Sequence, residues 1–119
     1  MAITRLGIAT RYSQVVIHNN TLYLSGQVPW KTAPAGETIE AQTQEVLDCI
    51  DQELATAGSD KSKILSLQIF MRNPDEYEQM NSVYDQWVSP GSSPARNTIC
   101  GVKFPNPTWL LEMVVVAAL

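Results

Sequence analysis

The feature that most constrains the fold is the C-terminal segment 110–118, where nearly every side chain is apolar. Successive side chains of a β-strand point to opposite faces of the sheet. One face would carry Leu111, Met113, Val115 and Ala117, and the other Leu110, Val114, Val116 and Ala118. We therefore expect this strand to be covered on both sides.

Two helices are predicted from the sequence. The first begins after Thr38, a suitable N-terminal cap, and its apolar residues recur at helical spacing until Gly58. The second begins at the sequence Asn73-Pro74-Asp75-Glu76, which combines a capping residue, a proline and an early acidic residue. It should end before Pro90.

The strands are predicted from β-branched and alternating apolar residues. Residues 15–18 and 21–25 should form a hairpin around Asn19-Asn20, because asparagine tolerates the backbone angles of a tight turn. Residues 4–9 form a weaker candidate strand, and Pro29 to Gly36 should be a surface loop. Leu65, Leu67, Ile69 and Met71 should share the buried face of a further strand, and residues 96–102 should form another.

This order of elements predicts an α+β fold with one mixed sheet and both helices packed on one of its faces. A chain of 119 residues should form a single domain, residues 1–119. Two helices cover only one face of the sheet, so the other should pack against neighbouring subunits. The pattern predicts an oligomer but not its symmetry.

Composition excludes several classes of protein. The net charge of −4 argues against nucleic-acid binding, which depends on clustered Lys and Arg. No signal peptide or membrane-spanning run is evident, so we expect a cytoplasmic protein without a membrane partner. Cys49, Cys100 and His18 do not form a recognisable zinc pattern, and Cys100 is expected in the core. We expect two reduced thiols and no metal.

Two charged residues interrupt otherwise apolar or small strand sequence, namely Arg96 and Glu112. Each is costly to bury alone. On adjacent C-terminal strands they could meet, and the pair would then supply a carboxylate-binding fork beside a potential general base. A structural ion pair is an equally good interpretation of the spacing alone.

Several weaker motifs accompany this pair: Tyr12-Ser13-Gln14, Leu24-Ser25-Gly26-Gln27, Met80-Asn81-Ser82-Val83-Tyr84 and Pro94-Ala95-Arg96. Taken singly, each is explained by turn chemistry or by a helix surface. Together, and in this order and spacing, they resemble the RidA/YjgF family over nearly the whole chain. The resemblance implies a chorismate-mutase-like subunit, a homotrimer and ligand clefts between subunits.

The resemblance also implies an activity, the hydrolysis of reactive enamine/imine intermediates such as 2-aminoacrylate to 2-keto acids and ammonia, without a cofactor. Arg96 would bind the carboxylate of the small-molecule substrate, and Glu112 would orient or activate water. Gly26 would offer backbone contacts, while Tyr12, Tyr77 and Asn81 would shape the cleft. Thr98 stands where deaminases of the family often have Cys, and its hydroxyl could bind the ligand.

Two other functions compete with a deaminase. A non-catalytic module could use the same cleft to bind 2-keto or amino acids, although the presence of both Arg96 and Glu112 favours an enzyme. RNA cleavage, which is reported for some relatives, fits poorly with the acidic charge.

Overall fold

The N-terminal strands form an antiparallel meander. In the computed structural model, which describes residues 2–119, β1 (Thr4–Ile8) pairs with β2 (Ser13–His18), and β2 pairs with β3 (Thr21–Leu24). Asn19 and Asn20 form the turn between β2 and β3 with φ values of 52° and 61°. These left-handed angles are the ones that asparagine tolerates best among non-glycine residues, so the predicted hairpin is confirmed.

Helix α1 (Ile39–Thr56) begins and ends as its sequence predicts. The Thr38 hydroxyl accepts a hydrogen bond from the Ala41 amide at 3.2 Å, and Gly58 has a φ of 86° just beyond the helix. The apolar stripe of α1 is fully buried against the sheet. Capping and amphipathic spacing thus specify this helix from local sequence.

Strand β4 (Ile64–Met71) follows a short 3₁₀ turn, Lys61–Lys63, and contains an irregularity that the sequence did not predict. The pairing with β6 shifts between Ile64 and Ser66, as at a β-bulge. The shift turns Leu65 to solvent, with 52% of its surface exposed, while Ile64 is buried in its place. The prediction that Leu65 shares the buried face is therefore wrong.

The second helical segment has two parts. A 3₁₀ turn, Pro74–Glu76, follows Asn73, whose side chain accepts a hydrogen bond from the Asp75 amide at 2.9 Å. Helix α2 (Tyr77–Trp87) continues from it and buries Met80, Tyr84 and Trp87. The start signal is confirmed, although regular α-helix begins three residues later than the proline suggests.

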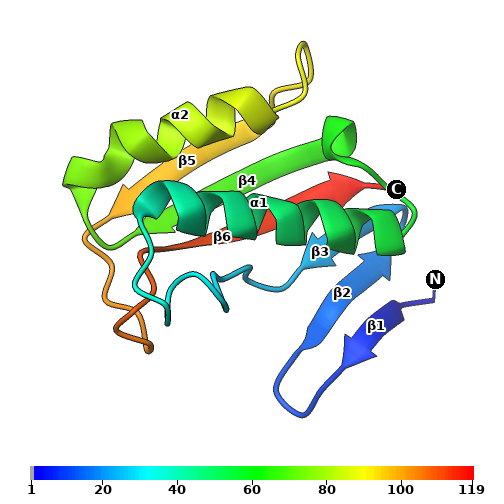
Figure 1. The fold of residues 1–119 in the computed structure, drawn as a ribbon. Coiled ribbons are helices and arrows are strands. Elements are labelled where there is room, and N and C mark those ends of the chain that lie inside the picture. The colour runs from blue at the N-terminus through cyan, green and yellow to red at the C-terminus, as the bar shows by residue number, and fades with distance from the viewer. Residues whose placement is uncertain (1) are drawn as a thin grey trace.

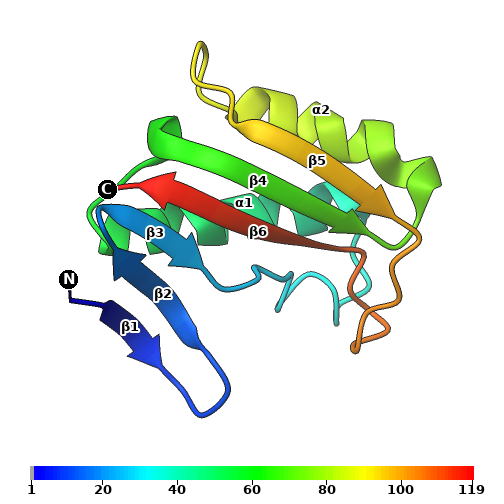
Figure 2. The ribbon, with the colours of Figure 1, turned by 180° about the vertical axis from the view of Figure 1, so that it is seen from behind.

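The six strands found in residues 2–119 belong to one mixed sheet in the order β1-β2-β3-β6-β4-β5. Strand β5 (Ala95–Cys100) runs parallel to β4, whereas β6 (Leu111–Ala118) is antiparallel to both β3 and β4. Both helices lie on one face of this sheet, and the opposite face is open in the chain (Figures 1 and 2). The predicted α+β architecture is confirmed.

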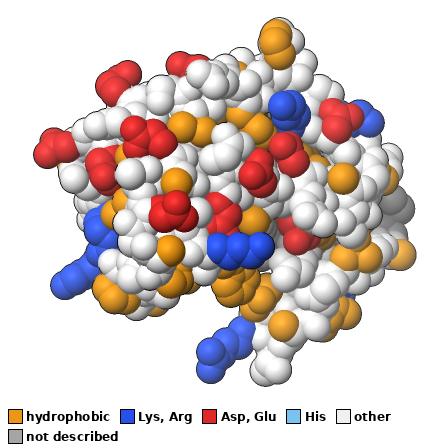
Figure 3. Space-filling view, viewed as in Figure 1, with side chains coloured by type: hydrophobic (Ala, Val, Ile, Leu, Met, Phe, Trp, Pro, Cys, Tyr) orange, Lys and Arg blue, Asp and Glu red, His pale blue; other side chains and the backbone are white. Residues whose placement is uncertain are grey.

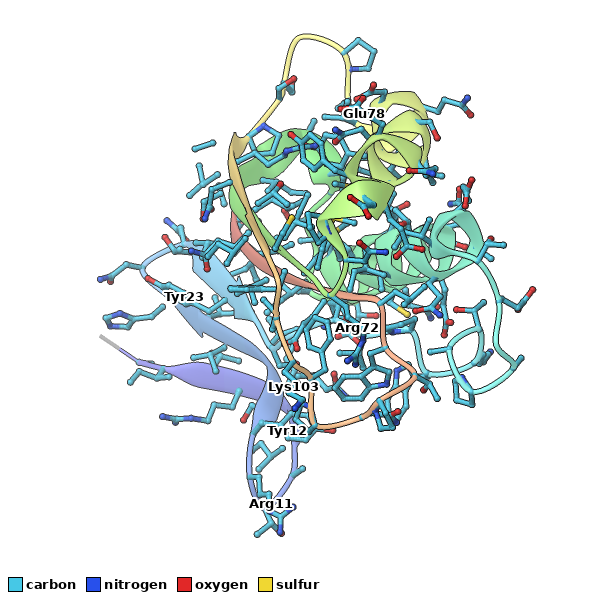
Figure 4. The ribbon with its side chains drawn as sticks, turned by 90° about the vertical axis from the view of Figure 1, so that its left-hand side faces the viewer. Arg11, Tyr12, Tyr23, Arg72, Glu78 and Lys103 are labelled. Atoms are coloured by element: carbon cyan, nitrogen blue, oxygen red, sulfur yellow. The ribbon has the colours of Figure 1, made fainter. Side chains whose placement is uncertain are left out.

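Strand β6 lies inside the sheet and differs between its two faces. Its helix-facing residues, Leu111, Met113, Val115 and Ala117, are fully buried. Its other residues are only half-buried, and large apolar side chains such as Tyr23 and Ile99 lie exposed elsewhere on the open face. Figure 4 shows Tyr23 on the side of the sheet away from the helices. Burial of this second face therefore stays a prediction about the assembly.

The two longest loops are held to the core by polar side chains. The Glu45 carboxylate accepts hydrogen bonds from the amides of Lys31 and Thr32 and from the Thr32 hydroxyl. These bonds attach the predicted 29–36 loop to α1. The 101–110 loop is held by Arg72, which donates to the carbonyls of Trp109 and Asn106 at 2.9 and 3.0 Å.

Gln42 provides a second anchor for the 101–110 loop. It is 1% exposed, its carbonyl oxygen accepts from the Leu110 amide at 2.9 Å, and its amide group donates to the carbonyls of Glu37 and Thr108. We predict that Gln42→Leu destabilises the protein by about 1–3 kcal/mol, because it leaves polar backbone groups without partners. Urea unfolding at one fixed protein concentration measures the change.

Gln44→Leu is the matched control, since Gln44 is exposed on the same helix and bonds only to the exposed Asp48 carboxylate. Its effect should stay within about 0.5 kcal/mol of zero. Equal effects of the two substitutions would contradict the proposed role of Gln42.

Candidate functional site

Arg96 lies on the helix-bearing face of the sheet. It is paired with Leu67, which is fully buried under the helices. Its Nη2 atom donates to the Asn81 Oδ1 atom at 2.8 Å and to the Tyr77 hydroxyl at 3.1 Å. The guanidinium carbon lies 4.6 Å from the ring centroid of Tyr84. Arg96 is thus oriented by neutral groups on α2, and its charge is not neutralised by these contacts.

The groups around the Arg96 guanidinium favour the binding of an anion. A guanidinium held on an aromatic ring and by neutral hydrogen-bond acceptors keeps its charge and presents a planar fork to a carboxylate. Both protein hydrogen bonds come from the same nitrogen, Nη2. The arrangement therefore differs from the structural ion pair with Glu112 that the sequence left open.

Thr98 points to the same face as Arg96, because it is two residues further along β5 and pairs with the buried Ile69. Its hydroxyl oxygen is buried and has no hydrogen-bond partner among the described residues. Buried hydroxyls are rarely left without a partner. This group could bind a ligand beside Arg96.

Tyr84 contacts Arg96, although the sequence analysis named it only within the Met80-Asn81-Ser82-Val83-Tyr84 motif and gave it no role of its own. Burial raises the pKa of its phenol, and Arg96 partly offsets this increase. Tyr77, Asn81 and Tyr84 follow the spacing i, i+4 and i+7, which places them on one side of α2. That spacing was the available signal, but only the structure shows which strand residue these side chains meet.

Glu112 lies on the opposite, open face. It alternates with the buried Leu111 and Met113 and pairs with Phe70 on β4. Burial raises the pKa of its carboxyl above the ordinary value. A carboxylate with a raised pKa is a stronger base than a solvated one, as general base catalysis near neutral pH requires.

Gly26 allows Glu112 to take this position. A Cβ atom at residue 26 would overlap the Glu112 carboxylate. The adjacent Gln27 holds Gly26 close to Glu112 on β6. The backbone amide of Gln27 donates to the Met113 carbonyl at 2.8 Å, and its carbonyl accepts from the Met113 amide at 3.0 Å. The absence of a side chain at Gly26 is thus required by the site itself.

A cavity of about 730 Å³ lies beside Glu112. Tyr12, from the turn that joins β1 and β2, and Gly26 also line it, together with residues of α1 and of the 29–36 loop. Figure 3 shows a notch at the lower edge of the molecule, between the β1–β2 hairpin and the rest of the chain, with hydrophobic side chains beside it. The volume lies within the range of small-molecule sites.

The two groups of predicted residues do not meet within one chain. Strand β4 separates β5 from β6, so the expectation that Arg96 and Glu112 lie on adjacent strands is wrong. Arg96 is accompanied by Tyr77, Asn81 and Thr98 on one face, while Glu112 is accompanied by Tyr12 and Gly26 at the cavity. A single site containing all seven requires two copies of the chain.

Other candidate chemistry finds no support in the described residues. Cys100 is exposed rather than buried in the core as predicted, because it lies at the end of an edge strand. No group of three or more His, Cys, Asp or Glu side chains among residues 2–119 could hold a metal ion. No helix in this range has both the length and the apolar character needed to cross a membrane.

Comparison with known proteins establishes the family. The sequence profile of the family described as endoribonuclease L-PSP matches residues 2–119. The chain belongs to this family. A RutC family protein of Haemophilus influenzae is 43% identical, with 98% of each chain covered. The RutC family protein YoaB of Escherichia coli is 40% identical, with 99% of each chain covered.

Solved structures of the family share the fold. A YjgF family member from Neisseria meningitidis superposes with a TM-score of 0.93 at 39% identity, over 99% of this chain and 95% of that one. A member of the Rid protein family from Yersinia pestis gives a TM-score of 0.83 at 34% identity, over 94% of this chain and 90% of that one. The resemblance to the RidA/YjgF family is therefore confirmed, whereas the roles of the individual site residues stay predictions.

We predict that Gly26→Ala moves the Glu112 carboxylate, because the added methyl group overlaps it. The displaced side chain gains solvent, so the pKa of Glu112, which burial raises, should fall towards its ordinary value. NMR titration of the Glu112 carboxyl carbon in both proteins measures this change.

Gly36→Ala is the control. Gly36 has a φ of 71° and open space around its Cα, so the substitution strains the backbone but does not touch Glu112. It should lower stability by about 1 kcal/mol and leave the pKa of Glu112 unchanged. An unchanged Glu112 pKa in Gly26→Ala would contradict the role assigned to Gly26.

Proposed function

We propose that this protein is an enamine/imine deaminase that hydrolyses 2-aminoacrylate-type intermediates to 2-keto acids and ammonia. The observation that carries the proposal is the Arg96 guanidinium, whose hydrogen-bond partners among residues 2–119 are neutral. The Thr98 hydroxyl, two residues further along the same strand, has no partner in this range. Such a group is suited to the carboxylate that every 2-imino acid carries. The resemblance to the RidA/YjgF family, whose solved members share this fold, implies the same reaction.

The reaction needs a positioned carboxylate and an activated water molecule. An enamine such as 2-aminoacrylate reacts as its imine tautomer, in which a proton has moved from the nitrogen to the methylene carbon. Arg96 binds the substrate carboxylate, which fixes the adjacent C=N carbon in one orientation. Glu112 accepts a proton as water attacks this carbon, and a C–O bond forms. Glu112 delivers this proton to the imine nitrogen, which gives a carbinolamine. It then moves the hydroxyl proton to the same nitrogen, so that the C=O bond forms as the C–N bond breaks and ammonia and a 2-keto acid are released. Tyr12, Tyr77 and Asn81 shape the cleft, and Gly26 leaves room for Glu112.

We propose that the site forms between subunits of a homotrimer. Arg96 and Glu112 lie on opposite faces of the sheet in one chain, so they can act on one substrate only when two chains contribute. The open face is rich in apolar side chains, and such a face favours association. A cytoplasmic location is part of this proposal, since intermediates of this kind arise in metabolism.

RNA cleavage is the activity that the family description names, but the surface gives it little support. Asp and Glu side chains spread over the helix-bearing face (Figure 3), and the net charge is −4. Nucleic-acid binding depends on clustered cations. The stronger alternative is a non-catalytic module that binds 2-keto or amino acids in the same cleft.

The test is to generate 2-aminoacrylate or 2-iminobutyrate with a pyridoxal-phosphate dehydratase and to follow keto-acid release. We expect the protein to accelerate release, and Arg96→Lys to lower kcat/KM on the order of a hundredfold, because lysine cannot reproduce the planar fork. Arg5→Lys is the matched control, because Arg5 is exposed on β1 and does not line the cavity. Unchanged release with the wild-type protein would leave the binding module as the better interpretation.

A shared site also predicts complementation between two inactive variants. Arg96→Ala and Glu112→Gln homotrimers should each be inactive. When subunits are mixed at random, an intact site needs Glu112 from one variant and Arg96 from the other, so about a quarter of the sites should be restored in a closed ring. Activity of the refolded mixture measures this, with the trimer verified by sedimentation.

Refolding each variant alone is the control for this experiment. A site contained within one chain would show no recovery in the mixture, and that result would refute the intersubunit arrangement.

A further inference from the structure

The cavity beside Glu112 extends well beyond the predicted catalytic residues. Two tryptophans, Trp30 and Trp109, line it together with Leu6 and Val28. The smallest substrate of the proposed reaction, 2-aminoacrylate, has only one methylene carbon in place of a side chain. In the single chain this cavity measures about 730 Å³, and the two indole groups in its wall offer more apolar surface than that ligand can cover.

Trp30 is exposed although its loop is firmly attached. Its side chain is 62% exposed, while the neighbouring residues Pro29 and Ala33 are buried. The amides of Lys31 and Thr32 donate to Glu45 at 3.0 and 2.9 Å, so the turn that presents Trp30 is attached to α1. The core does not use this indole, and a large apolar group held in solvent on an anchored turn is typical of a binding surface.

Trp109 is held in a similar way on the other loop. Arg72 donates to its carbonyl at 2.9 Å, and its ring lies 6.3 Å from the ring of Phe104 in an edge arrangement. Gln42 accepts from the amide of the next residue, Leu110, at 2.9 Å. Trp109 is three residues before Glu112, so its place in the cavity is fixed relative to the proposed base. Both tryptophans therefore belong to a preformed wall.

We propose that this wall selects the substrate, and that the protein prefers imines of amino acids with bulky apolar or aromatic side chains. The inference rests on the proposed deaminase function and specifies its substrate class. With the imine carbon beside Glu112, a long side chain can extend along Trp30 and Trp109 and remove their apolar surface from water. Glu53 also lines the cavity and disfavours imines with acidic side chains.

The test compares imines that one L-amino-acid oxidase makes from alanine, leucine, phenylalanine and arginine, with catalase present. Keto-acid formation is followed in competition with semicarbazide. We expect kcat/KM to be about tenfold higher for the leucine and phenylalanine imines than for the alanine imine, in line with the effect of apolar groups in a pocket. Trp30→Ala should reduce this ratio several-fold, and Trp109→Ala should do the same.

Lys31→Ala is the matched control, because it lies in the same turn, keeps the amide that bonds to Glu45, and does not line the cavity. It should leave the ratio unchanged. Trp30 is mostly exposed, so Trp30→Ala is expected to fold even if Trp109→Ala does not. An unchanged ratio in Trp30→Ala would overturn the proposal.

The outcomes separate this inference from the function on which it rests. If the protein does not accelerate the hydrolysis of any of these imines over the rate without protein, the deaminase proposal fails. If the alanine imine is hydrolysed as efficiently as the bulky ones, or if the arginine imine is preferred, the deaminase stands and the apolar substrate class fails. Equilibrium dialysis with phenylpyruvate and pyruvate tests, without turnover, whether the cavity prefers the bulky side chain. Equal affinities for the two keto acids would also refute the proposed preference.

Discussion

The alternation of side chains across the sheet is the constraint on which the proposed site depends. Strand β4 lies between β5 and β6, and the pairing of β4 with both neighbours fixes which residues face the helices. Arg96 shares a face with the buried Leu67, whereas Glu112 points to the other face. A one-residue slip of either strand would reverse its side chains, so the buried apolar rows that set the register also set the positions of both charged residues.

The surroundings of these two residues suit different tasks. Helix α2 supplies an amide, a phenol and an aromatic face to Arg96, which orient the guanidinium and leave it charged. Glu112 lies beside a glycine, and burial raises the pKa of its carboxyl. One chain therefore carries, on separate surfaces, a guanidinium suited to bind an anion and a carboxyl group suited to act as a base. In the proposed trimer, Arg96 of one chain and Glu112 of another would meet at one ligand.

Most of the fold could be predicted because its signals are local. The Thr38 cap, the glycine after α1 and the Asn19-Asn20 turn each act within a few residues, and each was identified correctly. Leu65 shows where this approach fails. Its place in an alternating pattern predicts burial, but the register shift near Ile64 arises from pairing with β6, which is distant in sequence. The prediction that Cys100 is buried is wrong for a related reason, since only the strand order shows that β5 is an edge strand.

The sequence by itself determined the helices and strands, the covering of only one face of the sheet by helices, and the choice of Arg96 and Glu112 as candidate site residues. These follow from periodicity, capping and the cost of burying a charge, which act on neighbouring residues or on single side chains. Only the tertiary structure decided that Arg96 and Glu112 lie on opposite faces, that Tyr84 lies beneath the guanidinium, and that two tryptophans share a cavity with Glu112. Each of these facts joins segments far apart in the chain, and strand order and register, which bring such segments together, are properties of the whole sheet.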